Sequence, residues 1–281
     1  MAKIAFLFLG GLLAFLVNST IYCQTINWSK ADTGLYVGNF ISPIKSTIGN
    51  SEITIVKINP KLYDFHIATA KEHHNKRYTV EQWCKLKGYI GAVNTGMFSL
   101  KDGLSNVGYM KRDTHINNKE FQPDFCSFLC YNPNDSTLPL MQILELCTKN
   151  DPQWSIIEKK YGSVTQSLRM INKQGTNVWA QSYKMWSMVV WGMDKSGNAL
   201  WIFTRSPFTV HTFINILKQA PLNIQNMMYL EGGPEGSLYF QHNGITLQKF
   251  GSYETGFFEK DTNDQFWPVP NVIGITKKKR K

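Results

Sequence analysis

Two apolar runs separated by a short polar turn constrain the fold of this chain most strongly. Residues 187–193 (SMVVWGM) and 199–205 (ALWIFTR) flank the turn DKSGN, in which Gly197 can adopt a positive φ. The β-branched and aromatic residues of both runs favour strands, so the pattern predicts a buried hairpin. A buried hairpin needs a large core around it, and a chain of 281 residues, 43% of them hydrophobic, can provide one.

Alternating apolar and polar residues predict a second pair of strands near the start of the domain. Residues 51–60 (SEITIVKINP) and 63–70 (YDFHIATA) both alternate in this way. We expect these two segments to pair with each other through a turn at residues 60–62. A further short apolar strand is expected in residues 89–98 (YIGAVNTGMF).

Helix signals occur twice in the chain. The segment TVEQWCKLKG has Thr79 as a candidate N-cap, Gln82 at the capping-box position and Gly88 as its end. The segment TVHTFINILKQAP has apolar residues at helical spacing between Thr209 and Pro221. Each helix is followed by a short apolar strand.

The centre of the chain gives weaker signals. Residues 101–150 are rich in Asn, Asp and Pro, so we expect loops there, with one helix near residues 138–149 (LPLMQILELCTK). No linker or low-complexity segment divides the chain. The sequence therefore predicts a single α+β domain over residues 25–276, with a mixed or antiparallel sheet and packed helices.

Residues 1–24 have the pattern of a secretory signal peptide. Lys3 precedes an apolar run at residues 4–17, and small and polar residues follow it. The apolar run is shorter than the roughly 20 residues of a spanning helix, so we expect no stable membrane span after cleavage and a secreted or periplasmic protein. Cys23 raises the alternative of a lipoprotein, although Tyr22 occupies a position where a small residue would be expected.

The charge, the cysteines and the absence of common motifs indicate which partners, disulfides and cofactors to expect. Half of the net charge of +10 is the basic tail KKKRK at residues 277–281, and no basic helix or aromatic RNA-binding motif is present. We therefore expect no nucleic-acid partner. After signal cleavage four cysteines remain, which can form one or two disulfides or stay as buried thiols: Cys84, Cys126, Cys130 and Cys147. No common metal or nucleotide motif occurs, so no cofactor and no metal are expected.

The stretch MYLEGGPEGSLYF places two carboxylates around a glycine-rich turn. Gly232 and Gly233 allow the backbone to bring its N–H groups close to a ligand, and the turn can hold Glu231 at the end of a strand. A similar sequence of helix, apolar strand, polar residue and glycine leads into Asn94. We expect the two strand ends to present Asn94 and Glu231 at one edge of a sheet, although a plain hairpin turn with solvated glutamates is the alternative.

Two arginines beside hydroxyl groups are candidates for binding an anion. Arg205 lies between Thr204 and Ser206, with His211 close behind it in the sequence. Arg169 follows Gln166 in the segment VTQSLRMI. A guanidinium can make two parallel hydrogen bonds to a phosphate or a carboxylate, but a structural ion pair is the alternative for each arginine.

Several segments together resemble the phosphodiester glycosidase family, and they occur in the family's order over about residues 51–275. GAVNTGMFS resembles the family's Asn-x-Gly-x-Phe motif, and YLEGGPEGSLYF resembles its Asp-Gly-Gly-Gly-Ser turn. VTQSLRMI, WGMDKSGNALWIFTRSP, GSYETGF and WPVPNVIGI are similar to segments of a secreted bacterial branch. The chain departs from the usual turn by having Glu231 for Asp, Pro234 for the third Gly and Glu235 for Ser.

The resemblance implies hydrolysis of the bond between a sugar's anomeric carbon and a phosphodiester oxygen, in a glycan or cell-envelope polymer. It implies Glu231 as the catalytic carboxylate, with Glu235 or Asp194 in reserve, Arg205 or Arg169 to neutralise the phosphate, and His211 as a proton carrier. Hydroxyl, amide and backbone groups would bind the substrate: Asn94, Gln166, Arg169, Thr204, Ser206, Gly232, Gly233 and Ser237.

Two other functions fit the sequence less well. One is a non-catalytic secreted binder of anionic glycan, which the three replacements in the turn allow. The other is an extracellular metal-dependent phosphodiesterase, for which the sequence offers no evident cluster of ligands.

Overall fold

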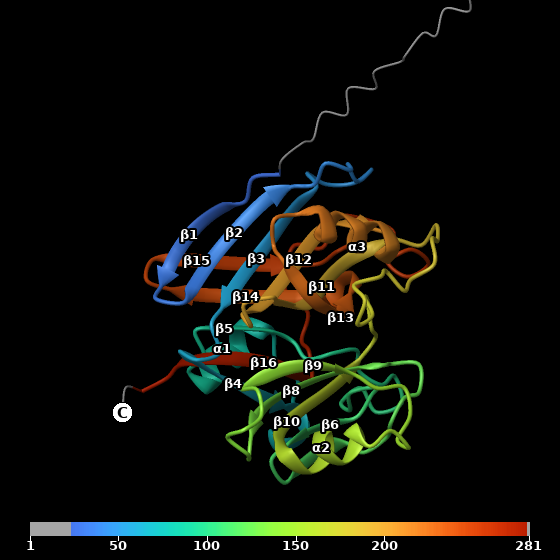
Figure 1. The fold of residues 1–281 in the computed structure, drawn as a ribbon. Helices are drawn as coiled ribbons and strands as arrows, with labels where there is room; N and C mark the ends of the chain where they lie inside the picture. Colours follow the sequence, from blue (N-terminus) through green and yellow to red (C-terminus); the bar gives the residue numbers. More distant parts are fainter. Residues whose placement is uncertain (1–23, 280–281) are drawn as a thin grey trace, which may run out of the picture.

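The computed structural model describes residues 24–279, which form three antiparallel sheets (Figure 1). The largest sheet has the strand order β1-β2-β3-β12-β11-β13. Its strands are β1 (Asn27–Asp32), β2 (Leu35–Ile41), β3 (Glu52–Ile58), β12 (Ala199–Phe208), β11 (Trp186–Asp194) and β13 (Ile224–Gly232).

The other two sheets have five strands each. The second has the order β15-β14-β5-β16-β4 and the third has the order β7-β6-β10-β8-β9. The second sheet contains β15 (Ile245–Phe250), β14 (Ser237–His242), β5 (Gly91–Asn94), β16 (Asn271–Lys277) and β4 (Tyr63–Thr69). The third contains β7 (His115–Asn118), β6 (Met110–Arg112), β10 (Tyr161–Ser167), β8 (Ser127–Pro133) and β9 (Met141–Glu145).

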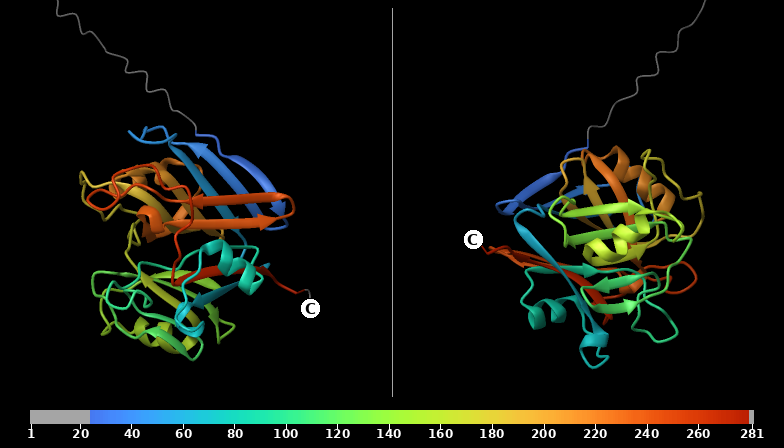
Figure 2. Two further views of the ribbon diagram at one scale, coloured as in Figure 1. Left: turned by 180° about the vertical axis from the view of Figure 1, so that it is seen from behind. Right: turned by 60° about the horizontal axis from the view of Figure 1, so that its bottom comes forward.

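One central core joins the three sheets. It contains Val56 and Trp201 from the first sheet, Phe65 and Ile273 from the second, and Leu129 from the third, among many others. The outer face of each sheet packs against a single helix: α3 (Val210–Gln219) on the first sheet, α1 (Val80–Lys87) on the second and α2 (Gln153–Lys160) on the third. Figures 1 and 2 show these helices at the periphery of the molecule.

Local signals in the sequence located two of the helices correctly. Helix α1 begins after Thr79, whose side chain forms a capping box with Gln82, and it ends at Gly88 with φ 67°. Helix α3 begins after Thr209, whose hydroxyl accepts a hydrogen bond from the Thr212 N–H. The hairpin of β11 and β12 also forms, with Gly197 at φ 80°.

The predicted α+β class is wrong, because strands dominate the structure and every strand pairing is antiparallel. The error arose in the centre of the chain. Residues 101–150 were expected to be mostly loops with one helix, but they contain four of the five strands of the third sheet. The helix expected near residues 138–149 is instead strand β9. Met141 and Ile143 are the buried residues of β9, and Gln142 between them is only half-buried, which is the spacing of a strand.

The pairing expected between the first two predicted strands is also wrong. Both strands form, as β3 and β4, but β3 pairs with β2 and β12 whereas β4 pairs with β16. The short connection at residues 59–62 therefore takes the chain from one sheet to another. A short connection permits a hairpin but does not require one.

Cysteine pairing is settled for the described residues. Cys126 and Cys147 form a disulfide across the ends of β8 and β9, while Cys84 and Cys130 are buried free thiols. The predicted signal peptide and the end of the basic tail lie outside the described residues. None of the helices in residues 24–279 is both long enough and apolar enough to span a membrane.

Candidate active site

Three glutamates gather around the glycine turn that follows β13. Glu231 is near the end of β13, Glu235 closes the 3₁₀ turn Gly233–Glu235, and Glu254 comes from the loop after β15. Gly233 has φ 60°, and a Cβ at this position would overlap the Glu254 carboxylate. The turn therefore needs glycine both for its backbone conformation and for the close approach of Glu254.

Strand β13 is irregular immediately before Glu231. Val189 of β11 pairs with Glu231, whereas its neighbour Val190 pairs with Tyr229. Between these two pairs β13 contains one residue more than β11, which is a β-bulge. Bulges re-aim the side chains beside them, and this one adjusts the direction of the Glu231 side chain at the sheet's end.

Glu231 is the most buried of the three carboxylates, with 8% of its surface exposed. Its Oε1 accepts a hydrogen bond from the Gly232 N–H at 3.1 Å, but Oε2 has no hydrogen-bond partner within residues 24–279. Trp186 Nε1, a buried donor beside Gly232, has no hydrogen bond of standard geometry in this part of the chain, although it is close enough to the Tyr229 hydroxyl to lower the pKa of Tyr229. Buried polar atoms are nearly always satisfied, so an unpaired acceptor and an unpaired donor at one turn are typical of a binding site.

Burial and mutual repulsion raise the pKa values of these carboxyls. Burial raises the pKa of Glu231 well above its ordinary value, and the charges of Glu235 and Glu254 raise it further. Burial also raises the pKa of Glu235 and the pKa of Glu254. The pKa of Tyr229 rises well above its ordinary value through burial and through the charges of all three glutamates. Tyr229 and the three carboxyls therefore form one electrostatic cluster.

Asn94 fixes the turn from the second sheet. Its Oδ1 accepts a hydrogen bond from the Ser237 N–H at 2.7 Å, and its Nδ2 donates to the Glu235 carbonyl at 3.0 Å. The Ser237 hydroxyl donates to the same carbonyl at 2.9 Å. The structure thus brings Asn94, Ser237 and the two predicted glutamates together, but the Asn94 amide is used to hold the backbone.

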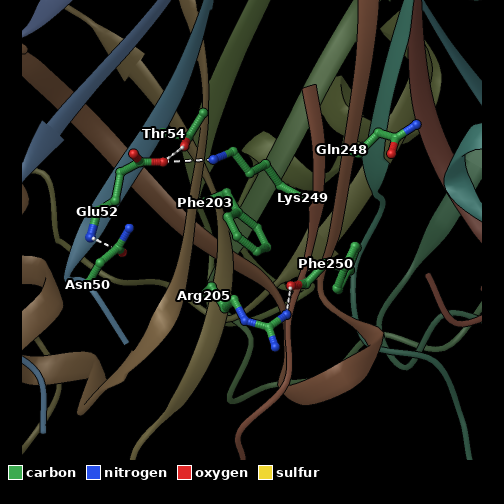
Figure 3. A pocket seen from close by; sticks show the side chains of 8 residues that line it. All are labelled: Asn50, Glu52, Thr54, Phe203, Arg205, Gln248, Lys249 and Phe250. Atoms are coloured by element: carbon green, nitrogen blue, oxygen red, sulfur yellow. Dashed lines mark hydrogen bonds and ion pairs between the residues drawn. The ribbon is translucent and has the colours of Figure 1, made fainter. Parts of the chain in front are cut away.

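Arg205 occupies a separate hollow, between β3, β12 and β15 (Figure 3). This cavity of about 200 Å³ is also lined by Phe203, Phe250 and the ion pair of Glu52 with Lys249. Arg205 Nη2 lies 2.7 Å from Asp261 Oδ1, and the guanidinium also donates to the carbonyls of Phe250 and Asn263. Its donors are therefore largely engaged within the protein.

The neighbours of Arg205 in the sequence are structural. The Thr204 hydroxyl donates to the Ser206 carbonyl, and the Ser206 hydroxyl accepts from the Ser51 N–H. His211 Nδ1 contacts the Trp179 carbonyl on the outer face of the first sheet. None of these contacts connects the three residues with the glutamate cluster.

Asp194, Gln166 and Arg169 lie elsewhere in the fold. Asp194 is at the opposite end of β11 from the residue that pairs with Glu231, about 17 Å along the strand at 3.3 Å per residue. Burial alone would raise the pKa of Asp194, but hydrogen bonds from Lys57 and Asn198 outweigh this effect and lower it.

Gln166 is fully buried and hydrogen-bonded to the backbone of the third sheet and its loops, through both its amide nitrogen and its oxygen. Arg169 forms an ion pair with Glu145. Neither of them joins the carboxylate cluster.

Sequence reasoning missed several members of the site. Glu254 lies in GSYETGF, a segment noted for its resemblance but not for its carboxylate. Tyr229 was read as a strand residue, and neither Trp186 nor Arg77, which lowers the pKa of Glu235, was considered. Only the pattern of an acidic residue before Thr-Gly could have drawn attention to Glu254. No group of three or more metal-ligating side chains suited to a metal ion occurs within the described residues.

A comparison with models of protein families finds a match. The sequence model of the phosphodiester glycosidase family matches residues 87–276. A comparison with curated protein sequences finds no match.

Two solved structures share the fold. The catalytic domain of zebrafish N-acetylglucosamine-1-phosphodiester alpha-N-acetylglucosaminidase, auto-inhibited by its pro-peptide, has a TM-score of 0.61 and 14% identity, over 91% of this chain and 89% of that one. A hypothetical protein from Synechocystis has a TM-score of 0.60 and 13% identity, over 89% of this chain and 63% of the other. At these identities the likeness shows the fold alone. Because the family model spans well over half of the sequence and includes the glycine turn with its glutamates, the chain belongs to the phosphodiester glycosidase family.

Proposed function

We propose that this protein is a hydrolase that cleaves a sugar-1-phosphodiester between the anomeric carbon and the bridging oxygen. The observation that carries the proposal is the buried, unpaired Glu231 Oε2 in a cluster of three carboxyls, on the turn that the family motif defines. A phosphate monoester is a good leaving group, so the main needs are a group that activates water and negative charge near the anomeric carbon.

The cluster can meet both needs. Glu231 is suited to accept a proton from the attacking water, because a carboxylate whose pKa is raised by burial is a stronger base than an ordinary glutamate. Glu235 is only partly buried and opens onto a hollow, so its carboxylate can stabilise the positive charge that develops on the sugar. In the proposed step, the water oxygen bonds to the anomeric carbon and its proton passes to Glu231. The C–O bond breaks and the phosphate monoester leaves with the bonding electrons.

The substrate and the place of action are parts of the same proposal. A sugar-phosphodiester in a glycan or cell-envelope polymer fits the family, and the predicted signal peptide supports action outside the cytoplasm. The Cys126–Cys147 disulfide is consistent with an oxidising compartment.

The test is a panel of sugar-1-phosphodiesters incubated with the purified protein, in which released sugar and released phosphate are both measured. We expect wild type to release sugar, and Glu231→Gln to lose at least about 100-fold in kcat, the usual effect of losing a general base. Glu120→Gln is the matched control, because Glu120 is an exposed glutamate outside the cluster.

Three results would contradict the proposal. Near wild-type turnover by folded Glu231→Gln would remove its assignment as the base. Release of a free alcohol with the sugar phosphate intact would place cleavage at phosphorus instead. Binding of the panel without any turnover would favour a non-catalytic glycan binder.

A further inference from the structure

The Glu235 carboxylate opens onto a hollow whose walls are mostly apolar. Its volume is about 450 Å³, and its lining consists of Arg77, Phe98, Leu100, Gly103, Glu235, Trp267 and Pro268. It therefore contains one cation and one carboxylate among apolar groups. A mostly apolar lining with a few placed polar groups is the usual composition of a small-molecule site, and here it suits a ligand with one charged group and an apolar part.

Arg77 is the cation of this hollow and its donors are free. Its guanidinium lies over the Phe98 ring, 4.9 Å from the ring centre, and against Gly103, where a Cβ would overlap it. Arg77 has no ion-pair partner within residues 24–279, unlike Arg205 and Arg169, which are paired with Asp261 and Glu145. The face of the guanidinium is thus held by the ring, while its N–H edges remain available for an anion.

Arg77 also lies outside the region shared with the family model, which begins at residue 87. The cation beside Glu235 is therefore contributed by a part of the chain that the family model does not describe. The positive charge of Arg77 acts on the glutamate cluster, because it lowers the pKa of Glu235, whereas burial and Glu254 raise it.

The rim of the hollow carries exposed apolar side chains. Leu100 is 96% exposed, and Phe257, which is 61% exposed, packs on Trp267 with ring centres 6.4 Å apart. The Leu100 loop is well ordered by hydrogen bonds, because the Asp102 carboxylate accepts from the N–H groups of Leu104 and Ser105. Apolar groups gathered at the mouth of a hollow mark a binding surface more often than chance exposure does.

We infer that this hollow is the leaving-group subsite, and that it binds the phosphate ester of an apolar alcohol. The inference rests on the proposed function. Arg77 would bind the phosphate next to Glu235, and the alcohol's hydrocarbon part would lie on Phe98, Leu100, Trp267 and Pro268. The preferred substrate is accordingly a sugar linked through phosphate to a lipid-like alcohol.

Binding of product-like phosphate monoesters tests the subsite without requiring turnover. Isothermal titration calorimetry would compare n-octyl phosphate, methyl phosphate and inorganic phosphate. We expect n-octyl phosphate to bind at least about tenfold more tightly than methyl phosphate, because several methylene groups leave water. Arg77→Ala should weaken both esters about tenfold, and Leu100→Ser should weaken n-octyl phosphate alone. Lys101→Ala, which removes an exposed charge from the same loop, is the matched control.

Equal affinity for the three phosphates would overturn the inference, since it would leave a plain anion site. An equal loss of affinity in Arg77→Ala and Lys101→Ala would also overturn it. Its failure can be separated from failure of the proposed function. Arg77-dependent binding of n-octyl phosphate by a protein that releases no sugar would keep the subsite and reject the hydrolase. Sugar release with the same KM for the octyl and methyl diesters, and with no change in Arg77→Ala, would keep the hydrolase and reject the subsite.

Discussion

At the scale of single residues, the protein places three carboxyl groups together at a buried turn, where their charged forms are least stable. Glu231, Glu235 and Glu254 share a turn, and burial raises the pKa of each. A water-exposed chain would ionise all three at neutral pH. The folded protein therefore gives up stability to keep carboxyls of raised pKa at this turn, a common compromise in active sites.

This cost predicts that an inactivating substitution stabilises the fold. The pKa of Glu231 is higher in the folded state than in the unfolded state, so its contribution to stability is greatest at low pH and declines as the pH rises through the folded value. Glu231→Gln removes that decline. We expect its Tm at pH 8 to exceed that of wild type by about 2–4 °C, the effect of roughly 1 kcal/mol in a protein near this size.

The stability difference should shrink as the pH falls to about 4, where wild-type Glu231 is protonated in both states. Differential scanning calorimetry of both proteins from pH 4 to 8 measures it, and Glu120→Gln provides the baseline for an exposed glutamate. A Tm for Glu231→Gln below that of wild type at pH 8 would show that the ionised carboxylate has a stabilising partner after all.

At the scale of elements, sequence reasoning succeeded where the signal is local. The caps of α1 at Thr79 and Gly88 are set by neighbouring side chains and backbone angles, so the sequence predicts them directly. Strand β9 was mistaken for a helix because five apolar-rich residues suit either structure until the partner strand is known. The partner of β4 is β16, some 200 residues later, and no local pattern identifies it.

The candidate site shows the same division. Glu231, Glu235, Asn94 and Ser237 could be predicted because their motifs carry both the glycines and the polar groups. Glu254 lies in an irregular loop, and its place over Gly233 depends on tertiary packing. Arg205 was a reasonable candidate by residue type, but the sequence does not reveal Asp261 as its partner.

The two hydrogen bonds from the Asn94 side chain of β5 to the glycine turn, here called the clamp, yield a prediction at this scale. Asn94→Ala leaves the buried Ser237 N–H without its acceptor and removes one of two donors from the Glu235 carbonyl. We expect the free energy of unfolding to fall by about 2 kcal/mol in urea denaturation, and sugar release to fall because Glu235 is less well held.

Asn39→Ala is the matched control, since Asn39 is an exposed strand asparagine, and it should stay within about 0.5 kcal/mol of wild type. Unchanged stability of Asn94→Ala would mean that the turn keeps its shape without the clamp.

At the scale of the whole molecule, two sheets carry the site, and the third sheet contacts it through one strand end. Glu231 comes from the six-stranded sheet, while Asn94, Ser237 and the loop that carries Glu254 belong to or follow strands of the second. The third sheet contributes to the common core and reaches the site at the end of β10, where the Ser167 hydroxyl donates a hydrogen bond to the Tyr229 carbonyl. Changes in the third sheet that keep this hydrogen bond should therefore alter stability while leaving the chemistry intact.

The disulfide of the third sheet tests this separation. Cys126 and Cys147 are 21 residues apart, and closing a loop of this size stabilises a protein by about 3 kcal/mol through the unfolded state. The double variant Cys126→Ala, Cys147→Ala should lose stability of this order in urea denaturation, with kcat for sugar release unchanged at 25 °C. Reductant should lower the stability of wild type to that of the variant and leave the variant unaffected. A fall in kcat while circular dichroism shows the variant folded would mean that the third sheet does shape the site.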